Sequence, residues 1–259
     1  MRMFFIWLLT LATAVFSQAQ ALACGAETAC NVGSRSYHVQ TPQHWDGAQK
    51  LPVLLHLHGW GRQGRNVMRN TRITGPADRH GLLLIAPDGI RKSWGFNGDG
   101  VRDTEFLQRV IRDAARRWPI DLGRIYVSGF SYGGAMAWRL ACNLGDQFAG
   151  YLPIAGGLWR QSDVECAGPV RLAHVHGLDD TVYGLPVSAW DDTEDGVLLW
   201  RRINGTPGAP DRRFDHARYD CRVWGADQEL TLCTHPGGHF IPKDWLDWAL
   251  ARMLSVQTE

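Results

Sequence analysis

The sequence predicts an α/β fold, in which a mostly parallel β-sheet carries helices on both faces. Two continuous apolar runs, residues 51–57 and 82–86, have the length and composition of strands that are buried on both sides. Residues 103–118 place apolar side chains at helical spacing and end before Pro119, which indicates a helix covering such a sheet. Alternation of strands and helices favours parallel pairing.

The other elements follow in chain order. We expect further strands at residues 125–127, 151–155, 170–176 and 229–233, and further helices at 135–142 and 245–254. No internal repeat, charge block or Pro/Ser-rich linker interrupts this pattern. Residues 24–259 are therefore expected to form a single domain.

The N-terminal residues 1–23 have the features of a secretory signal peptide. One arginine precedes the apolar run 4–16, and the segment ends in Ala21-Leu-Ala23, which is typical of a cleavage site. The apolar run is short for a membrane span, so a membrane anchor is the less favoured alternative. Lipid modification of Cys24 is a second alternative, although such sites usually carry Leu where this chain has Ala21. We expect a secreted or periplasmic protein.

All six cysteines lie downstream of the expected cleavage site. An even number of cysteines in an exported protein indicates disulfides, but sequence alone does not choose among the pairings. Local spacing favours Cys24 with Cys30, Cys142 with Cys166, and Cys221 with Cys233 across a hairpin. A metal site is the competing interpretation, but the chain has no C-x-x-C motif. We expect no metal and no cofactor.

The formal net charge is +1, so the composition does not indicate a strongly basic surface. We therefore expect neither nucleic acid nor an anionic membrane surface as a partner.

The chemistry of the chain centres on Ser131 in the sequence Gly129-Phe-Ser-Tyr-Gly133. An apolar, β-branched run precedes this serine and a helix-forming stretch follows it, which predicts a sharp strand-to-helix turn. Side chains at the two glycine positions would collide with the neighbouring strand and helix. The turn presents the hydroxyl at its tip, next to a helix N-terminus that favours an anion. In a chain with 29 glycines the bare motif is a modest signal, so its context carries the prediction.

A serine hydroxyl becomes a good nucleophile when an imidazole removes its proton and a carboxylate fixes the imidazole tautomer. His239 lies in a glycine-opened loop after the last expected strand and is the candidate base, with His235 as its rival. The loop after the penultimate expected strand holds Asp179 and Asp180, of which only one can meet the imidazole. The order serine, aspartate, histidine is that of α/β-hydrolases.

The loop His58-Gly-Trp-Gly61 follows an early strand, where hydrolases of this order present a backbone N–H to an oxyanion. We expect the N–H groups of Trp60 and Tyr132 to be the two donors. The alternative is that the glycines only make a turn.

Several segments together match one family. They are Leu57-His-Gly59, His80-Gly81 with Ala86-Pro-Asp-Gly89, residues 120–136, His176-Gly-x-x-Asp180, and Gly237-Gly-His239 with Pro242. From Leu51 to Pro242 the chain resembles the secreted polyhydroxybutyrate depolymerase and feruloyl esterase family of α/β-hydrolases. The resemblance implies the α/β-hydrolase fold and a triad of Ser131, Asp180 and His239.

This resemblance implies a secreted serine carboxylic-ester hydrolase that works through an acyl-enzyme on a small-molecule or oligomeric ester. The alternatives are a serine peptidase of the same fold and a non-catalytic carbohydrate- or surface-binding protein on a hydrolase scaffold. The family's loop commonly reads G-H-T-W-P, whereas this chain has Gly238-His-Phe-Ile-Pro242, which leaves the acyl specificity open. The sequence ends at Glu259 without an added polymer-binding module, so we expect soluble esters to be preferred over crystalline polymer. The oligomeric state is left open.

Five of the twelve tryptophans fall in or near expected loops. They are Trp94, Trp159, Trp190, Trp200 and Trp224. For each of them taken singly, core or rim packing is the favoured interpretation, but as a group the tryptophans of residues 159–200 are the expected substrate wall.

Overall fold

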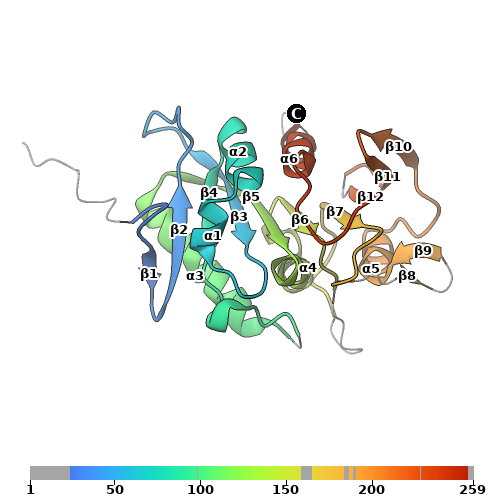
Figure 1. Ribbon diagram of the computed structural model, residues 1–259, viewed down its shortest axis with the longest axis horizontal. Helices are drawn as coiled ribbons and strands as arrows, with labels where there is room; N and C mark the ends of the chain where they lie inside the picture. The colour runs from blue at the N-terminus through green and yellow to red at the C-terminus, as the bar shows by residue number, and fades with distance from the viewer. Residues whose placement is uncertain are drawn as a thin grey trace, which may run out of the picture.

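The computed structural model describes residues 24–97, 99–158, 165–183, 187–188, 191–227 and 229–255, so the expected signal peptide lies outside the described residues. These residues form a large sheet with helices on both sides (Figure 1). In the order in which its strands lie side by side, the sheet consists of β1 (Cys30–Val32), β2 (Arg35–Gln40), β4 (Leu83–Pro87), β3 (Leu51–Leu57), β5 (Ile120–Phe130), β6 (Gly150–Ile154), β7 (Leu172–Gly177), β12 (Leu230–His235), β11 (Tyr219–Trp224) and β10 (Arg212–His216). A separate pair is formed by β8 (Val187–Ser188) and β9 (Asp191–Glu194).

The centre of the sheet, from β4 to β12, is parallel. All the strands expected from the sequence lie in this central part, so the predicted α/β architecture is confirmed. Because parallel strands need crossover connections, helices cover both faces and the carboxyl ends of the strands meet along one edge.

Both margins of the sheet are antiparallel. Of these pairings, the sequence analysis had expected only the hairpin that joins Cys221 and Cys233. β2 pairs antiparallel with β4, and β11 pairs antiparallel with β12. The segment from β8 to β11 also stands between β7 and β12 in the chain. β7 is therefore the neighbour of β12 in the sheet. We had expected β7 to be the penultimate strand of the chain, but β11 holds that position.

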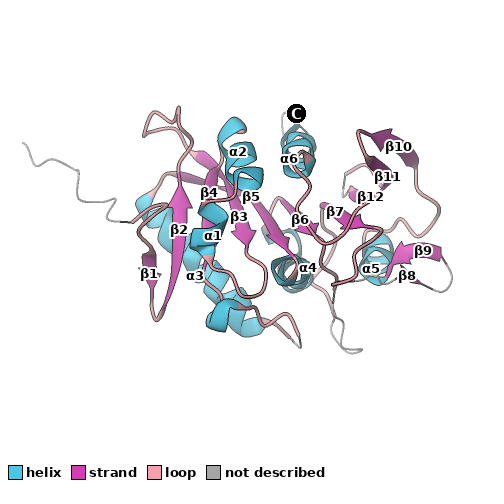
Figure 2. Cartoon of the chain, viewed as in Figure 1, coloured by secondary structure: helices cyan, strands magenta, loops and turns pink. Residues whose placement is uncertain are grey.

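The helices divide into two groups, one for each face of the sheet (Figure 2). Helices α3 (Val101–Arg117), α4 (Tyr132–Leu144) and α5 (Asp195–Ile203) bury their apolar residues in one core cluster. Helices α1 (Gly64–Met68), α2 (Thr71–Arg79) and α6 (Trp245–Ser255) contribute to a second cluster. Short 3₁₀ turns occur at η1 (Ile90–Lys92) and η2 (Gly145–Gln147).

Strand β3 shows why its sequence is apolar throughout. Val53, Leu55 and Leu57 pack into the cluster of α3, α4 and α5, whereas Leu54 packs into the cluster of α1, α2 and α6. Successive side chains of a strand point to opposite faces, so both faces of a covered sheet need apolar residues. His56 has the same parity as Leu54 and belongs to the face of α1 and α2, where it becomes important below.

All three expected disulfides are present: Cys24–Cys30, Cys142–Cys166 and Cys221–Cys233. The last one joins directly opposed residues of the antiparallel strands β11 and β12, as the hairpin interpretation expected. Within the described ranges no helix combines the length and the apolar character that crossing a bilayer would require.

Candidate active site

Ser131 lies at the turn between β5 and α4. Its backbone has φ 57° and ψ −118°, a sparsely populated conformation for a residue other than glycine, with a cost of about 1–3 kcal/mol. Two backbone hydrogen bonds hold this conformation. The Ser131 N–H donates to the Ile154 carbonyl at 2.9 Å, and the Ser131 carbonyl accepts from the Ala135 N–H at 2.8 Å.

The glycines around Ser131 are required by close backbone approach, as the sequence analysis expected. A Cβ on Gly129 would collide with the Gly133 carbonyl, and a Cβ on Gly133 would collide with the carbonyl of Leu57 at the end of β3. A Cβ on Gly156 would collide with the Ser131 carbonyl itself. The turn therefore fits tightly against the ends of β3 and β6, and this fit fixes where the serine stands.

Asp180 and His239 come together from two neighbouring loops. Asp180 follows β7, and His239 lies between β12 and α6. The His239 Nδ1 and the Asp180 Oδ2 are 2.6 Å apart, which is a short hydrogen bond. Main-chain bonds connect the same loops, since the Asp179 N–H donates to the Gly237 carbonyl at 3.0 Å. The pairing of these side chains is thus supported by the backbone beneath them.

Both oxygens of the Asp180 carboxylate accept hydrogen bonds. Its Oδ1 accepts from the backbone N–H groups of Val182 at 2.9 Å and Tyr183 at 2.8 Å, while its Oδ2 faces His239. Burial alone raises the pKa of Asp180, but the Tyr183 N–H, the His239 imidazole and the Val182 N–H outweigh it and lower the pKa below its ordinary value. Asp180 is therefore ionised at neutral pH and can stabilise an imidazolium.

The two rival residues occupy other positions. Asp179 is exposed, and its contact with the His239 loop is made by its backbone. His235 is buried, and its ring packs on Phe240 with 5.0 Å between the ring centroids. The structure therefore places Asp180, and not Asp179, on the imidazole of His239.

His176 is a contributor to which the sequence analysis assigned no role, although it named the motif that contains this residue. Its Nε2 lies 2.7 Å from the Tyr183 carbonyl and 3.4 Å from Asp180 Oδ2, and its side chain is fully buried. His176 thereby helps to fix the loop that carries Asp180. The signal was its place at the start of the His-Gly-x-x-Asp motif.

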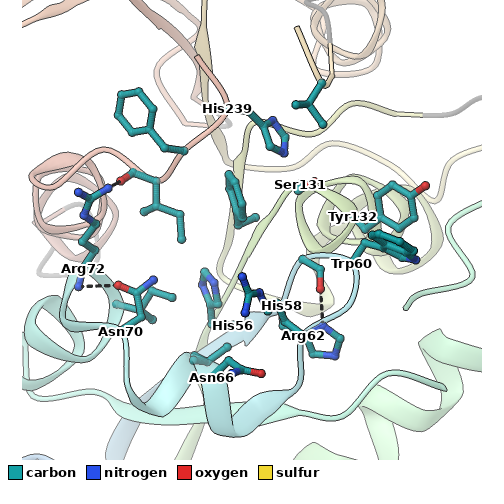
Figure 3. Close-up of a pocket in the computed structure, with 17 residues that line it drawn as sticks. His56, His58, Trp60, Arg62, Asn66, Asn70, Arg72, Ser131, Tyr132 and His239 are labelled. Atoms are coloured by element: carbon teal, nitrogen blue, oxygen red, sulfur yellow. Dashed lines mark hydrogen bonds between the residues drawn. The ribbon is translucent and has the colours of Figure 1, made fainter. Parts of the chain in front are cut away.

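Ser131 and His239 open into one cavity of about 790 Å³ (Figure 3). This volume lies in the range of small-molecule sites. The His239 ring contacts Phe130, the residue before Ser131, with 4.8 Å between the ring centroids. Trp60 and Tyr132, the two residues expected to supply oxyanion donors, also line the cavity. In the described part of the chain, neither of their backbone N–H groups donates a hydrogen bond within the protein.

Phe240 and Ile241 line the cavity where the resembled family commonly has threonine and tryptophan. No group of three His, Cys, Asp or Glu side chains that could hold a metal ion occurs among the residues that the structure describes.

Core packing, the favoured interpretation for each loop tryptophan taken singly, is confirmed for the three that are described, and Trp200 is therefore not part of a substrate wall. Trp94 is 5%, Trp200 0% and Trp224 1% exposed. Each is part of the core: the Trp94 indole donates to the His58 carbonyl, the Trp224 indole donates to the Gly208 carbonyl, and Trp200 packs edge-on against Trp138. Trp159 and Trp190 lie outside the described residues.

The exposed tryptophan of the cavity is Trp60, which is 70% exposed. Sequence reasoning had singled out this residue for its backbone alone.

No family model matches the chain. Among curated proteins, it is 30% identical over 149 residues to a bifunctional acetylxylan esterase/xylanase of Neocallimastix patriciarum, which covers 57% of this chain and 22% of that enzyme. It is 25% identical over 220 residues to a probable feruloyl esterase C of Aspergillus niger, which covers 80% of this chain and 77% of the relative.

Among solved structures, the acetyl xylan esterase of Aspergillus awamori superposes with a TM-score of 0.65 at 14% identity, covering 82% of this chain and 94% of that one. At this identity the likeness establishes the fold. The chain spans less than two thirds of the length of several curated relatives, down to 22%. The chain therefore has the α/β-hydrolase fold, and it is similar in sequence to carboxylic-ester hydrolases named feruloyl esterase C and acetylxylan esterase.

Proposed function

We propose that this protein is an exported serine carboxylic-ester hydrolase that acts through an acyl-enzyme. The observation that carries the proposal is the 2.6 Å contact between His239 and Asp180 at the wall of the cavity into which Ser131 opens. An imidazole oriented by a buried carboxylate beside a serine on a strained turn is the arrangement that activates a hydroxyl.

In this mechanism the Ser131 Oγ attacks the ester carbonyl while His239 Nε2 takes the hydroxyl proton. Asp180 accepts the Nδ1–H of His239, which fixes the tautomer and stabilises the imidazolium. The backbone N–H groups of Trp60 and Tyr132 hold the oxyanion, since both line the cavity and have no partner in the described protein.

His239 then gives the proton to the leaving alcohol, and the acyl group remains on Ser131. Water attacks this acyl-enzyme with His239 as base, so that the acid leaves and the serine is restored. These steps need no metal or cofactor.

Export rests on the three disulfides, which persist in oxidising compartments, and on the signal-peptide features of the N-terminal sequence. A cavity of small-molecule size further supports soluble esters of aromatic or short-chain acids, or hydroxyacid oligomers, as substrates.

A hydrolysis panel tests the proposal. It compares short-chain acyl esters, methyl ferulate, soluble hydroxybutyrate oligomers and amorphous polymer, with Ser131→Ala as the control. Hydrolysis of at least one soluble ester by the wild type, lost in Ser131→Ala, is the expected result. No hydrolysis of any ester, or equal hydrolysis by the variant, contradicts the proposal.

A further inference from the structure

The cavity extends from Ser131 toward the polar side chains at α1 and α2, and the charged side chains of this region are all cationic. It is lined by Arg62, Asn66, Asn70 and Arg72, and no Asp or Glu is among the described residues that line the cavity (Figure 3). A cavity wall made of cations and amides without a carboxylate gathers positive potential inside a concave surface.

The two guanidinium groups are not neutralised by the protein. Several arginines of this molecule face an acid directly, as Arg69 faces Glu27 at 3.2 Å. In contrast, Arg62 has no carboxylate within ion-pair distance among the described residues, and neither has Arg72. The Arg72 Nη1 donates to the Ile241 carbonyl at 2.6 Å, which positions the guanidinium at the cavity and leaves its charge uncompensated.

The two asparagines present donors rather than acceptors. The Asn66 Oδ1 accepts from the Gln63 N–H at 3.0 Å, and the Asn70 Oδ1 accepts from the Arg72 N–H at 3.1 Å. With each amide oxygen turned to a backbone N–H, the NH₂ groups are the parts left for a ligand. Four side chains of this wall therefore offer N–H donors to the cavity.

An independent observation comes from the adjacent strand β3. His56 is 1% exposed and lines the cavity, yet its Nδ1 is buried without a hydrogen-bond partner. Buried polar atoms in folded proteins are nearly always satisfied. A polar side chain in an otherwise apolar strand, unsatisfied and at the cavity wall, points to a bound polar group.

We propose that this cavity takes an ester whose acid or alcohol part carries a carboxylate, bound by the guanidinium groups of Arg62 and Arg72 and by the amide N–H groups of Asn66 and Asn70. This proposal rests on the proposed function and adds the charge of the substrate to it. Guanidinium and amide N–H groups match the acceptor-only oxygens of a carboxylate, and charge-assisted hydrogen bonds are the strongest of their kind.

Two matched substrate pairs test the proposal with the wild-type protein. The acyl pair is the 4-nitrophenyl monoester of glutaric acid and 4-nitrophenyl valerate. The alcohol pair is 3-acetoxybenzoate and its methyl ester. In at least one pair, kcat/KM for the anionic member is expected to exceed that for the neutral member by about tenfold or more, a factor that corresponds to ~1.4 kcal/mol. Equal or lower values for the anionic member in both pairs overturn the proposal.

Variants show whether the named side chains cause the preference. Arg62→Gln should lower the anionic-to-neutral ratio by about tenfold. The matched control is Arg65→Gln, because Arg65 is an exposed arginine of α1 that is absent from the cavity wall. Because Arg72→Gln also removes the guanidinium donor to the Ile241 carbonyl, Arg72→Lys, which keeps the charge, is measured beside it and should retain most of the preference. A ratio that is the same in Arg62→Gln and Arg65→Gln contradicts the assignment.

A binding measurement separates failure of this proposal from failure of the proposed function. Calorimetry compares 3-acetamidobenzoate, an amide analogue, with its methyl ester. Tighter binding of the carboxylate, lost in Arg62→Gln, supports the anion site even if no ester is hydrolysed. Absence of that preference overturns the site, even if neutral esters are hydrolysed in a Ser131-dependent way.

Discussion

Replacement of Asp180 by Asn exchanges one carboxylate oxygen for an NH₂ group at the point where the candidate triad is oriented. The Asp180 Oδ1 accepts from two backbone N–H groups, and the Oδ2 faces the Nδ1 of His239 at 2.6 Å. An asparagine keeps its oxygen toward the two N–H donors, because the opposite orientation would leave both unsatisfied at about 1–3 kcal/mol each. Its NH₂ group therefore faces His239.

The consequence is a change of tautomer. Facing an NH₂ donor, His239 presents Nδ1 as an acceptor and carries its proton on Nε2, which can then no longer accept the proton of Ser131. The same change in a trypsin-like triad lowers kcat by about 10⁴-fold. We expect a loss of this size in kcat/KM, which corresponds to about 5.5 kcal/mol of transition-state stabilisation.

The assay is steady-state hydrolysis of a neutral 4-nitrophenyl ester, with the melting temperature of each variant as a folding check. Asp179→Asn is the matched control, since Asp179 is the exposed neighbour in the same loop. Its kcat/KM should stay within about threefold of the wild type. A folded Asp180→Asn with near wild-type turnover, or a larger loss in Asp179→Asn, refutes the orientation argument.

Three further predictions concern the nucleophile, the cysteines and a buried histidine. Ser131→Ala should keep the fold and lower turnover by about 10⁴-fold or more in an ester assay, because its hydroxyl contributes chemistry rather than packing. Thiol titration of the denatured, unreduced protein should detect essentially no free thiol, since all six cysteines are paired; six titratable thiols would contradict the disulfides. Burial, followed by the charge of His58, lowers the pKa of His56 to about 3 from 6.5. The unfolded state therefore binds more protons below about pH 6.5, and His56 should make unfolding about 2 kcal/mol easier at about pH 5 than at about pH 7.5. Urea unfolding at both pH values checks this, and His56→Leu should show a shallower pH dependence; an unchanged dependence would contradict it.

The centre of the fold could be predicted because buried parallel strands are apolar without interruption. Leu51–Leu57 and Leu83–Pro87 carry that signal, and both are strands. The margins carry a weaker one. β2 and β10 are short and contain charged or polar residues. For β10 the reason is that it is an edge strand with one unpaired side. Their antiparallel pairing depends on tertiary contacts that no local pattern encodes.

The residues proposed for the triad could be named from the sequence because each one sits in a turn with its own glycine pattern. The polar wall of the cavity could not be predicted from the sequence. Asn66, Asn70 and Arg72 belong to short helical segments whose polar residues look like an ordinary solvated surface. They share a cavity with Ser131 because α1 packs against β2 and β4 and α2 against β4, which are long-range contacts.

The tryptophans show how loop position misleads. Trp94 and Trp224 lie in or next to loops, yet each indole N–H finds a backbone carbonyl and the ring is then buried. A large ring with a satisfied N–H contributes more as packing than as exposed surface.

Labelling with a fluorophosphonate tests the central claim most directly, because the reagent modifies a serine only when a neighbouring base activates it. The wild-type protein is incubated with the probe, digested and analysed by peptide mass spectrometry, beside Ser131→Ala and Asp180→Asn. The mechanism predicts one labelled peptide with the modification on Ser131, no label in Ser131→Ala, and much slower labelling in Asp180→Asn. An unlabelled wild type, or a label on another serine that persists in Ser131→Ala, would contradict it.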